Sequence, residues 1–287
     1  MLKRPLVLAL GGGGARGFAH IGVLRVLERE NIPIKGIAGT SMGAIVGALF
    51  AQTQNSFAVE KKIKEFLRSP VFERSRTNHK AFGSFLEQVA VDLCEQLKNA
   101  RHMRETIAHM DAEMHKAMIS LFGTADIRDC AIPFAAVATD LRDGAEIRLT
   151  KGSLAQAVLA SSAMPGILSP VSIDGYLLSD GAATSAVPVR AARSVWPKTN
   201  VVAVDVSSQL SAHPPLDNSL SIIVRNCAIT GFFYHKELIK EADVLIQPHV
   251  KIFGWNEFDN IDDFISEGEQ ATLLKSRLIK KVARRLG

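Results

Sequence analysis

The sequence has few cysteines and few aromatic residues. Its three cysteines, Cys94, Cys130 and Cys227, are odd in number and lie far apart, and there is no Cys-x-x-Cys pair. This pattern argues against a disulfide framework and a zinc knuckle, and it favours a reduced, cytoplasmic setting. Aromatic residues make up 6% of the chain and interleave with no basic stretch, so a nucleic-acid partner is not expected.

Segments typical of signal peptides or membrane spans are also lacking. The apolar run Leu6–Leu10 stops after five residues at Gly11, whereas the apolar part of a signal peptide needs about 7–15. Two longer stretches without charge occur at residues 36–59 and 152–173. Polar residues interrupt the first and prolines interrupt the second, so we interpret both as buried core.

The overall composition is that of an ordinary globular protein. Of 287 residues, 47% are hydrophobic and 22% are charged, and a chain of this length can bury a core without a metal or a disulfide. The net charge of +5 and the pI of about 9.2 are weak indications of contact with an anionic membrane surface or of an acidic substrate.

Apolar runs alternate with helical periodicity along the chain. Strands at Leu6–Leu10 and Ile34–Ala38, each followed by a helix (Phe18–Glu30 and Met42–Ala51), predict a βαβ unit of a parallel sheet. The α/β pattern returns after residue 130. Further strands are expected at Pro133–Thr139, Glu146–Leu149, Tyr176–Leu178, Val201–Val206 and Val244–Ile246, and further helices at Leu154–Ala160, Val189–Ser194, Leu220–Lys240 and Ile261–Leu286.

Residues 56–123 differ from the rest because they contain no convincing strand. The spacing of Ile63, Phe66 and Leu67 predicts one helical face, and that of Phe85, Val89 and Leu93 predicts another. We therefore expect a helical cap at about 56–123, inserted within a single α/β domain that spans residues 1–287.

A glycine-rich loop follows the first strand. Gly12, Gly14 and Gly17 satisfy the dinucleotide-binding pattern G-x-G-x-x-G. The acidic residue that such a site needs is missing, because the second strand runs into Ala38-Gly39-Thr40-Ser41. The loop also offers bare N–H groups at the start of a helix, which suits either a bound phosphate or a developing oxyanion.

A possible nucleophile lies at the end of the second strand. Gly39-Thr40-Ser41-Met42-Gly43 is a G-x-S-x-G turn between a strand and a helix, the setting in which a serine is projected from a sheet as a nucleophile. Ser41 then needs a proton acceptor. His213 and His249 follow strands and are one choice, and Asp180, in the turn Asp180-Gly181-Ala182, is another.

Taken together, these motifs resemble the patatin-like phospholipase family. Gly12–Gly17 resembles its oxyanion loop, Gly39–Gly43 its nucleophile elbow and Asp180–Ala182 its catalytic-aspartate motif, and Ala160–Pro165 resembles a small-residue turn ahead of that aspartate. The resemblance spans residues 5–50 and 130–210. The tail Ala242–Glu269 resembles bacterial members akin to the neuropathy-target-esterase branch.

The resemblance implies a three-layer α/β/α fold with a mainly parallel sheet, and a Ser41–Asp180 dyad with no catalytic histidine. Ser41 is then the nucleophile and Asp180 the general base of a lipid ester hydrolase of the phospholipid or lysophospholipid class, with no metal or cofactor. The implied oxyanion hole is Gly12, Gly13 and Gly14, and the implied supporting residues are Arg16, Gly17, Gly39, Gly43 and Gly181.

Three alternatives remain at this point: a nucleotide- or phosphate-binding α/β protein, a catalytically silent regulatory protein of the same fold, and a Ser-His-Asp hydrolase. The expected location is the cytoplasm, with peripheral contact at the inner membrane surface. Acyl chain length, head group and oligomeric state do not follow from the sequence.

Overall fold

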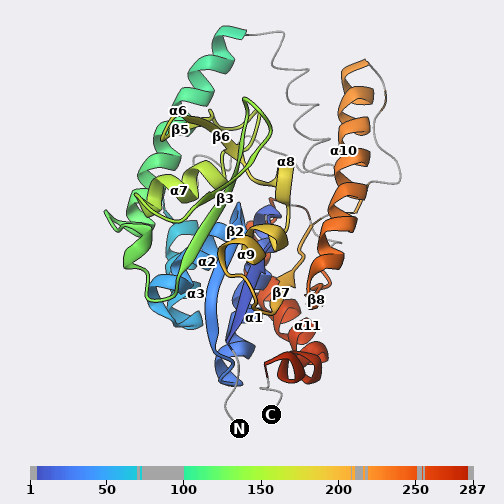
Figure 1. Ribbon diagram of the computed structural model, residues 1–287. Coiled ribbons are helices and arrows are strands. Elements are labelled where there is room, and N and C mark those ends of the chain that lie inside the picture. Colours follow the sequence, from blue (N-terminus) through green and yellow to red (C-terminus); the bar gives the residue numbers. More distant parts are fainter. Residues whose placement is uncertain are drawn as a thin grey trace.

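The computed structural model describes residues 5–69, 72, 100–207, 209–210, 216, 219–250, 254 and 256–283, and within them eight strands form one mixed sheet (Figure 1). The strands are β1 (Leu6–Leu10), β2 (Ile34–Thr40), β3 (Phe134–Asp140), β4 (Glu146–Leu149), β5 (Val171–Ile173), β6 (Tyr176–Asp180), β7 (Val201–Val204) and β8 (Val244–Ile246). Their order across the sheet is β5-β6-β3-β2-β1-β7-β8, and β4 pairs with β3 off this path.

Five neighbouring strands, β3, β2, β1, β7 and β8, are parallel. At the other side of the sheet, β4 and β6 pair with β3 in the antiparallel direction, and β5 pairs with β6 in the same way. The predicted α/β class with a mainly parallel sheet is confirmed. β5 was not predicted, because it is only three residues long and directly follows Pro170.

The α-helices lie singly or in short series between the strands, and α11 follows the last strand. They are α1 (Ala19–Arg29), α2 (Met42–Thr53), α3 (Ser56–Leu67), α6 (Ala100–Phe122), α7 (Leu154–Ser161), α8 (Ala182–Ser185), α9 (Val189–Val195), α10 (Ser219–Leu238) and α11 (Ile261–Val282). Short 3₁₀ helices occur at η1 (Gly14–Phe18), η3 (Ile127–Asp129), η4 (Ile239–Glu241) and η5 (Phe258–Asn260).

Both faces of the parallel strands are buried, which explains their uninterrupted apolar sequences. In β1, Leu6, Leu8 and Leu10 belong to a core with α1, α2, α7 and α11, whereas Val7 and Ala9 pack with α9 on the opposite face. Successive side chains of a strand point to opposite faces, so one strand contributes to two cores. The result is three layers, α/β/α.

The first and last helices cross at very short distance. A Cβ atom added to Gly268 of α11 would lie 1.9 Å from the carbonyl oxygen of Ala19 in α1, so only glycine fits there. Arg25 of α1 adds ion pairs to Glu60 of α3 and to Glu269 of α11. These contacts hold α1, α3 and α11 together on one face of the sheet.

The predicted cap region begins and ends in helices that pack on this layer. Asn55 caps α3 by accepting a hydrogen bond from the backbone N–H of Ala58 (2.9 Å), and the Ser56 hydroxyl donates to Glu28 of α1 (2.6 Å). At the other end, α6 packs against α7. Residues 73–99 lie outside the described residues, so the insertion boundaries stay a prediction. No helix in the described part of the chain has the length and apolar character needed to cross a membrane.

Candidate active site

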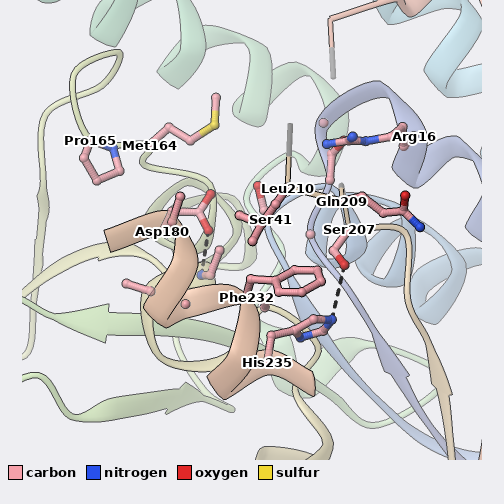
Figure 2. A pocket seen from close by; sticks show the side chains of 18 residues that line it. Arg16, Ser41, Met164, Pro165, Asp180, Ser207, Gln209, Leu210, Phe232 and His235 are labelled. Atoms are coloured by element: carbon pink, nitrogen blue, oxygen red, sulfur yellow. Dashed lines mark hydrogen bonds between the residues drawn. The ribbon is translucent and has the colours of Figure 1, made fainter. Parts of the chain in front are cut away.

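β3 separates the two strands that carry the predicted nucleophile and base. Thr40 of β2 pairs with Val137 of β3, so Ser41 follows at the level of Ala138. On the other side of β3, Asp180 of the antiparallel β6 pairs with Ala138 itself. Adjacent strands are about 4.8 Å apart, which puts the two backbones about 10 Å apart. Their side chains therefore meet only by leaning toward each other over β3, and they do so (Figure 2).

Ser41 occupies a strained turn between β2 and α2. Its backbone angles are φ 54° and ψ −123°, a conformation that side-chain-bearing residues rarely adopt. The turn closes only because small residues surround it. A Cβ atom on Gly43 would lie 2.2 Å from the carbonyl oxygen of Leu10, and one on Gly39 would lie 2.5 Å from that of Gly43. The G-x-S-x-G spacing thus has a steric cause at both glycines.

Asp180 is buried and directed at Ser41. Its carboxylate accepts a hydrogen bond from the backbone N–H of Ala182 (2.8 Å), and the Ser41 side chain lies beside it (Figure 2). Burial raises the pKa of the Asp180 carboxyl to about 6, and the Ala182 N–H and the nearby Ser41 side chain oppose this rise only in part. Its carboxylate is therefore a stronger base than an exposed aspartate.

The glycine loop brings backbone amide groups close to Ser41. The N–H of Gly12 donates to the carbonyl of Ala186 (2.9 Å), so this donor is already used. The N–H groups of Gly13 and Gly14 make no hydrogen bond within the described residues. A Cβ atom on Gly12 would lie 3.1 Å from Cβ of Ser41, which shows how closely the loop approaches the serine.

Arg16 supports this loop from behind. Its side chain is 4% exposed, and its Nε donates to the carbonyl of Gly13 (3.2 Å). Burial lowers the pKa of its guanidinium to about 10, and the negative charges of Asp205 and Glu257 offset part of that decrease. The remaining predicted supporting glycines also lie close to the site: Gly17 contacts Met42, and Gly181 contacts the Val137 backbone.

Two residues that position the site escaped the sequence analysis. The Ser161 hydroxyl accepts a hydrogen bond from the backbone N–H of Ser41 (3.0 Å) and donates to the carbonyl of Val137 (2.6 Å). His20 Nε2 lies 2.7 Å from the carbonyl oxygen of Gly11, and burial lowers the pKa of His20 to about 4. A neutral His20 thus donates to Gly11. Only the small-residue turn around Ser161 left a trace in the sequence.

A second polar cluster lies beside the dyad and was not predicted. His235 Nε2 of α10 lies 3.2 Å from Asp205 Oδ1 and 3.2 Å from Ser207 Oγ, and Gln247 also donates to Asp205 (2.9 Å). Burial alone favours the protonated carboxyl of Asp205. The hydrogen bonds from His235 and Ser207 outweigh it and hold the pKa well below its usual range.

None of the histidines in the described residues hydrogen-bonds to Ser41. His249 is exposed, and the other predicted candidate, His213, lies outside the described residues. The geometry therefore supports Asp180 rather than a described histidine as the partner of Ser41.

The Ser41 and Asp180 side chains, the glycine loop and the Ser207–His235 pair border one pocket with a volume of about 230 Å³ (Figure 2). Apart from the polar groups already described, its walls are mostly apolar. The lining residues are Gly12, Gly13, Gly14, Arg16, Ser41, Met164, Pro165, Asp180, Ala182, Ala183, Ala186, Ser207, Gln209, Leu210, Ala228, Gly231, Phe232 and His235. Within the described residues, no group of three or more His, Cys, Asp or Glu side chains is arranged to hold a metal ion.

Comparisons with known proteins show the family to which this chain is similar. The family model described as patatin-like phospholipase matches residues 8–193. Over 206 residues the chain is 34% identical to human patatin-like phospholipase domain-containing protein 6, which covers 71% of this chain and 13% of the human protein. Over 184 residues it is 33% identical to an uncharacterized NTE family protein of Mycobacterium tuberculosis, covering 64% of this chain and 44% of that protein.

Among solved structures, VipD from Legionella pneumophila has a similar fold. The TM-score is 0.51 at 13% sequence identity, and the match covers 98% of this chain and 67% of VipD. This likeness concerns the fold alone. The chain spans less than half of the length of either relative named above.

Proposed function

Because the chain belongs to the patatin-like phospholipase family, we propose that it is a serine hydrolase that cleaves carboxylic esters of lipids. The proposed substrates are phospholipids or lysophospholipids. The observation that carries the proposal is that Ser41, in its strained turn, lies beside the buried carboxyl of Asp180 and beside the Gly13 and Gly14 amides, which make no hydrogen bond within the described residues (Figure 2).

In the first half of the reaction, Ser41 Oγ attacks the carbonyl carbon of the ester while its proton passes to Asp180. The carbonyl oxygen becomes an oxyanion within reach of the Gly13 and Gly14 N–H groups. Each such donor stabilises a transition state by roughly 2.7–4 kcal/mol. The C–O bond to the alcohol then breaks, and the alcohol leaves with the proton from Asp180. The acyl group stays on Ser41.

In the second half, a water molecule attacks the acyl-enzyme and gives its proton to Asp180. The new tetrahedral intermediate uses the same two amides. It collapses to the free acid as Ser41 Oγ leaves and regains a proton from Asp180. Asp180 therefore acts as base and then as acid in each half-reaction.

The raised pKa of Asp180 suits this role. An ordinary aspartate, with a pKa near 3.8, is a weak base at neutral pH, whereas a value of about 6 brings Asp180 close to the working pH. The carboxyl is still mostly ionised at about pH 7, so it is both available and more basic. Burial between β3 and the pocket supplies this effect without a histidine.

The pocket walls support an acyl chain as the ligand. The space around Ser41 is bordered by the apolar side chains of Met164, Pro165, Leu210 and Phe232 (Figure 2). These side chains can contact an acyl chain without forming hydrogen bonds to it. A lipid substrate also agrees with the proposed peripheral contact at a membrane from the cytoplasmic side. We also propose that residues 56–123 form a helical cap of the domain.

Labelling with a fluorophosphonate probe tests the proposal. The parent protein should be labelled and should hydrolyse a short p-nitrophenyl ester, and Ser41→Ala should lose both activities. Ser207→Ala is the matched control, because Ser207 lines the same pocket and contacts a histidine. It should still be labelled. Labelling that survives in Ser41→Ala and disappears in Ser207→Ala would assign the nucleophile to Ser207 and contradict the proposal.

A further inference from the structure

The polar cluster beside the dyad takes no part in the proposed reaction. Its members are Asp205, Ser207, His235 and Gln247, and within the described residues none of the four hydrogen-bonds to either member of the dyad. Asp205 is 2% exposed and His235 is 7% exposed. Because an ionised carboxylate is costly to bury, its presence next to a mostly apolar pocket is not explained by packing alone.

The carboxylate of Asp205 determines where the proton lies in this cluster. Hydrogen bonds hold the pKa of this carboxyl well below its usual range, so it is ionised and can only accept hydrogen bonds. His235 Nε2, 3.2 Å from Asp205 Oδ1, therefore carries a proton and donates it. The same Nε2 lies 3.2 Å from Ser207 Oγ, which thus accepts from His235.

Ser207 is the member of the cluster that can meet a ligand. It is partly exposed, and it lines the pocket together with His235 (Figure 2). A serine hydroxyl has one proton and two lone pairs, and His235 takes up one lone pair. The other lone pair can accept from a ligand, and the proton can be donated to one. A ligand hydroxyl can play either part.

The charges around Ser207 favour a neutral ligand. The Asp205 carboxylate accepts from the Ser207 backbone N–H (3.0 Å), and its negative charge opposes a second anion at the same place. Arg16, a cation in the pocket wall, already experiences the negative charges of Asp205 and Glu257. A hydroxyl group brings no charge, whereas a lipid phosphate brings a negative charge and only accepts hydrogen bonds.

The position of Ser207 indicates which part of the substrate carries this hydroxyl. In Figure 2, Ser207 lies on one side of Ser41, and Met164 and Pro165 lie on the other. A simple fatty acyl chain has no hydroxyl and fits the apolar side, so the alcohol part of the ester extends toward Ser207. The leaving oxygen stays near Asp180, because it is bonded to the carbonyl carbon that Ser41 attacks.

We propose that Ser207, held by His235 and Asp205, forms a hydrogen-bonding subsite for a hydroxyl group on the alcohol part of the ester. This inference rests on the proposed ester hydrolase function. Ser207 is then a specificity-determining residue, and the other two are positioning residues. A site that hydrogen-bonds a substrate hydroxyl discriminates against the analogue that lacks it, because the polar group of the site is then left without a partner.

Two soluble esters that differ in one hydroxyl test the subsite: 2-hydroxypropyl butanoate and propyl butanoate. We expect the kcat/KM of the parent to be about tenfold or more higher for the hydroxylated ester, after division by the ratio of their alkaline hydrolysis rates. In Ser207→Ala this corrected ratio should fall close to one. Ser207→Thr keeps a hydroxyl and should keep a ratio well above that of Ser207→Ala.

The matched control is Met164→Ala, at a residue that lines the same pocket on the other side of Ser41. It should change kcat/KM for both esters to the same extent and keep the parental ratio. A parental ratio near one, an unchanged ratio in Ser207→Ala, or an equal loss in Met164→Ala would each overturn the proposal. A purely structural role of the cluster would lower the unfolding free energy of Ser207→Ala and leave the ratio unchanged. Failure of the proposed function shows differently, as absent probe labelling and absent hydrolysis of both esters.

Discussion

Asp180→Asn should make the protein more stable at neutral pH. Burial raises the pKa of the Asp180 carboxyl from 3.8 to about 6, so the folded protein holds this proton more tightly than the unfolded chain does. The protonated carboxyl therefore contributes stability that is fully present below about pH 4. That contribution is lost as the pH rises through about 6.

The size of the effect follows from the two pKa values. A difference of about two units corresponds to about 3 kcal/mol of unfolding free energy above about pH 7. Asparagine keeps the shape of the side chain and an oxygen that can accept from the Ala182 N–H, but it has no charge to bury. The stability difference between variant and parent should therefore increase by about 2 kcal/mol from about pH 4.5 to about pH 8.

Urea unfolding of both proteins at these two pH values measures this difference, and any effect of the substitution that does not depend on pH cancels. Asp205→Asn serves as the control of opposite sign. Hydrogen bonds from His235 and Ser207 lower the pKa of Asp205 despite its burial, so Asp205 contributes stability at neutral pH that is lost on acidification. A stability difference for Asp180→Asn that stays constant, or shrinks as the pH rises, would refute the reasoning.

The same substitution should remove most of the activity. With no base to accept the proton of Ser41, we expect the kcat for a short ester to fall about 10²- to 10⁴-fold. A variant that is more stable at about pH 8 and nearly inactive would separate the catalytic role of the carboxyl from its effect on folding. Parental turnover in Asp180→Asn would show that Asp180 is not the general base.

Three further results are expected. The kcat/KM of the parent should rise with pH through a limb near 6, because Asp180 must be ionised, and a limb near 4 would contradict its raised pKa. Ser161→Ala should lower kcat about tenfold or more with little change in KM, because Ser41 loses a positioning hydrogen bond, and steady-state kinetics measure both. Gly268→Ala should lower the unfolding free energy by about 2 kcal/mol or more, whereas Gly231→Ala, with open space around its Cβ, should not lower it in urea titrations.

The parts of the fold that the sequence revealed are those with strong local patterns. β1 is an unbroken apolar run because it is buried on both faces, and the chain enters a glycine loop directly after it. The end of β7 was placed two residues late, because Asp205 and Val206 are buried although the strand stops at Val204. The antiparallel direction of β6 has no local signature, since direction depends on which strands pair.

The residues of the site also differ in whether a local sequence pattern predicts them. Ser41 and Asp180 lie in short motifs with glycine neighbours, so they could be identified from the sequence. Contacts between distant segments involve Ser161, Asp205 and His235. A local sequence motif does not predict such contacts. The hydrogen bond from the Gly12 N–H to the carbonyl of Ala186 could not be predicted for the same reason, because the two residues are far apart in the sequence.

The arrangement of β2, β3 and β6 also has a consequence for how activity arises during folding. Ser41 and Asp180 are 139 residues apart in the chain, and β3 must lie between their strands before they can meet. Closing so long a loop costs chain entropy, and this cost is offset only when the strands pair. A nascent chain that carries Ser41 but not yet β6 holds a serine of ordinary reactivity. Probe labelling during refolding should therefore lag behind the formation of secondary structure and report the completed sheet.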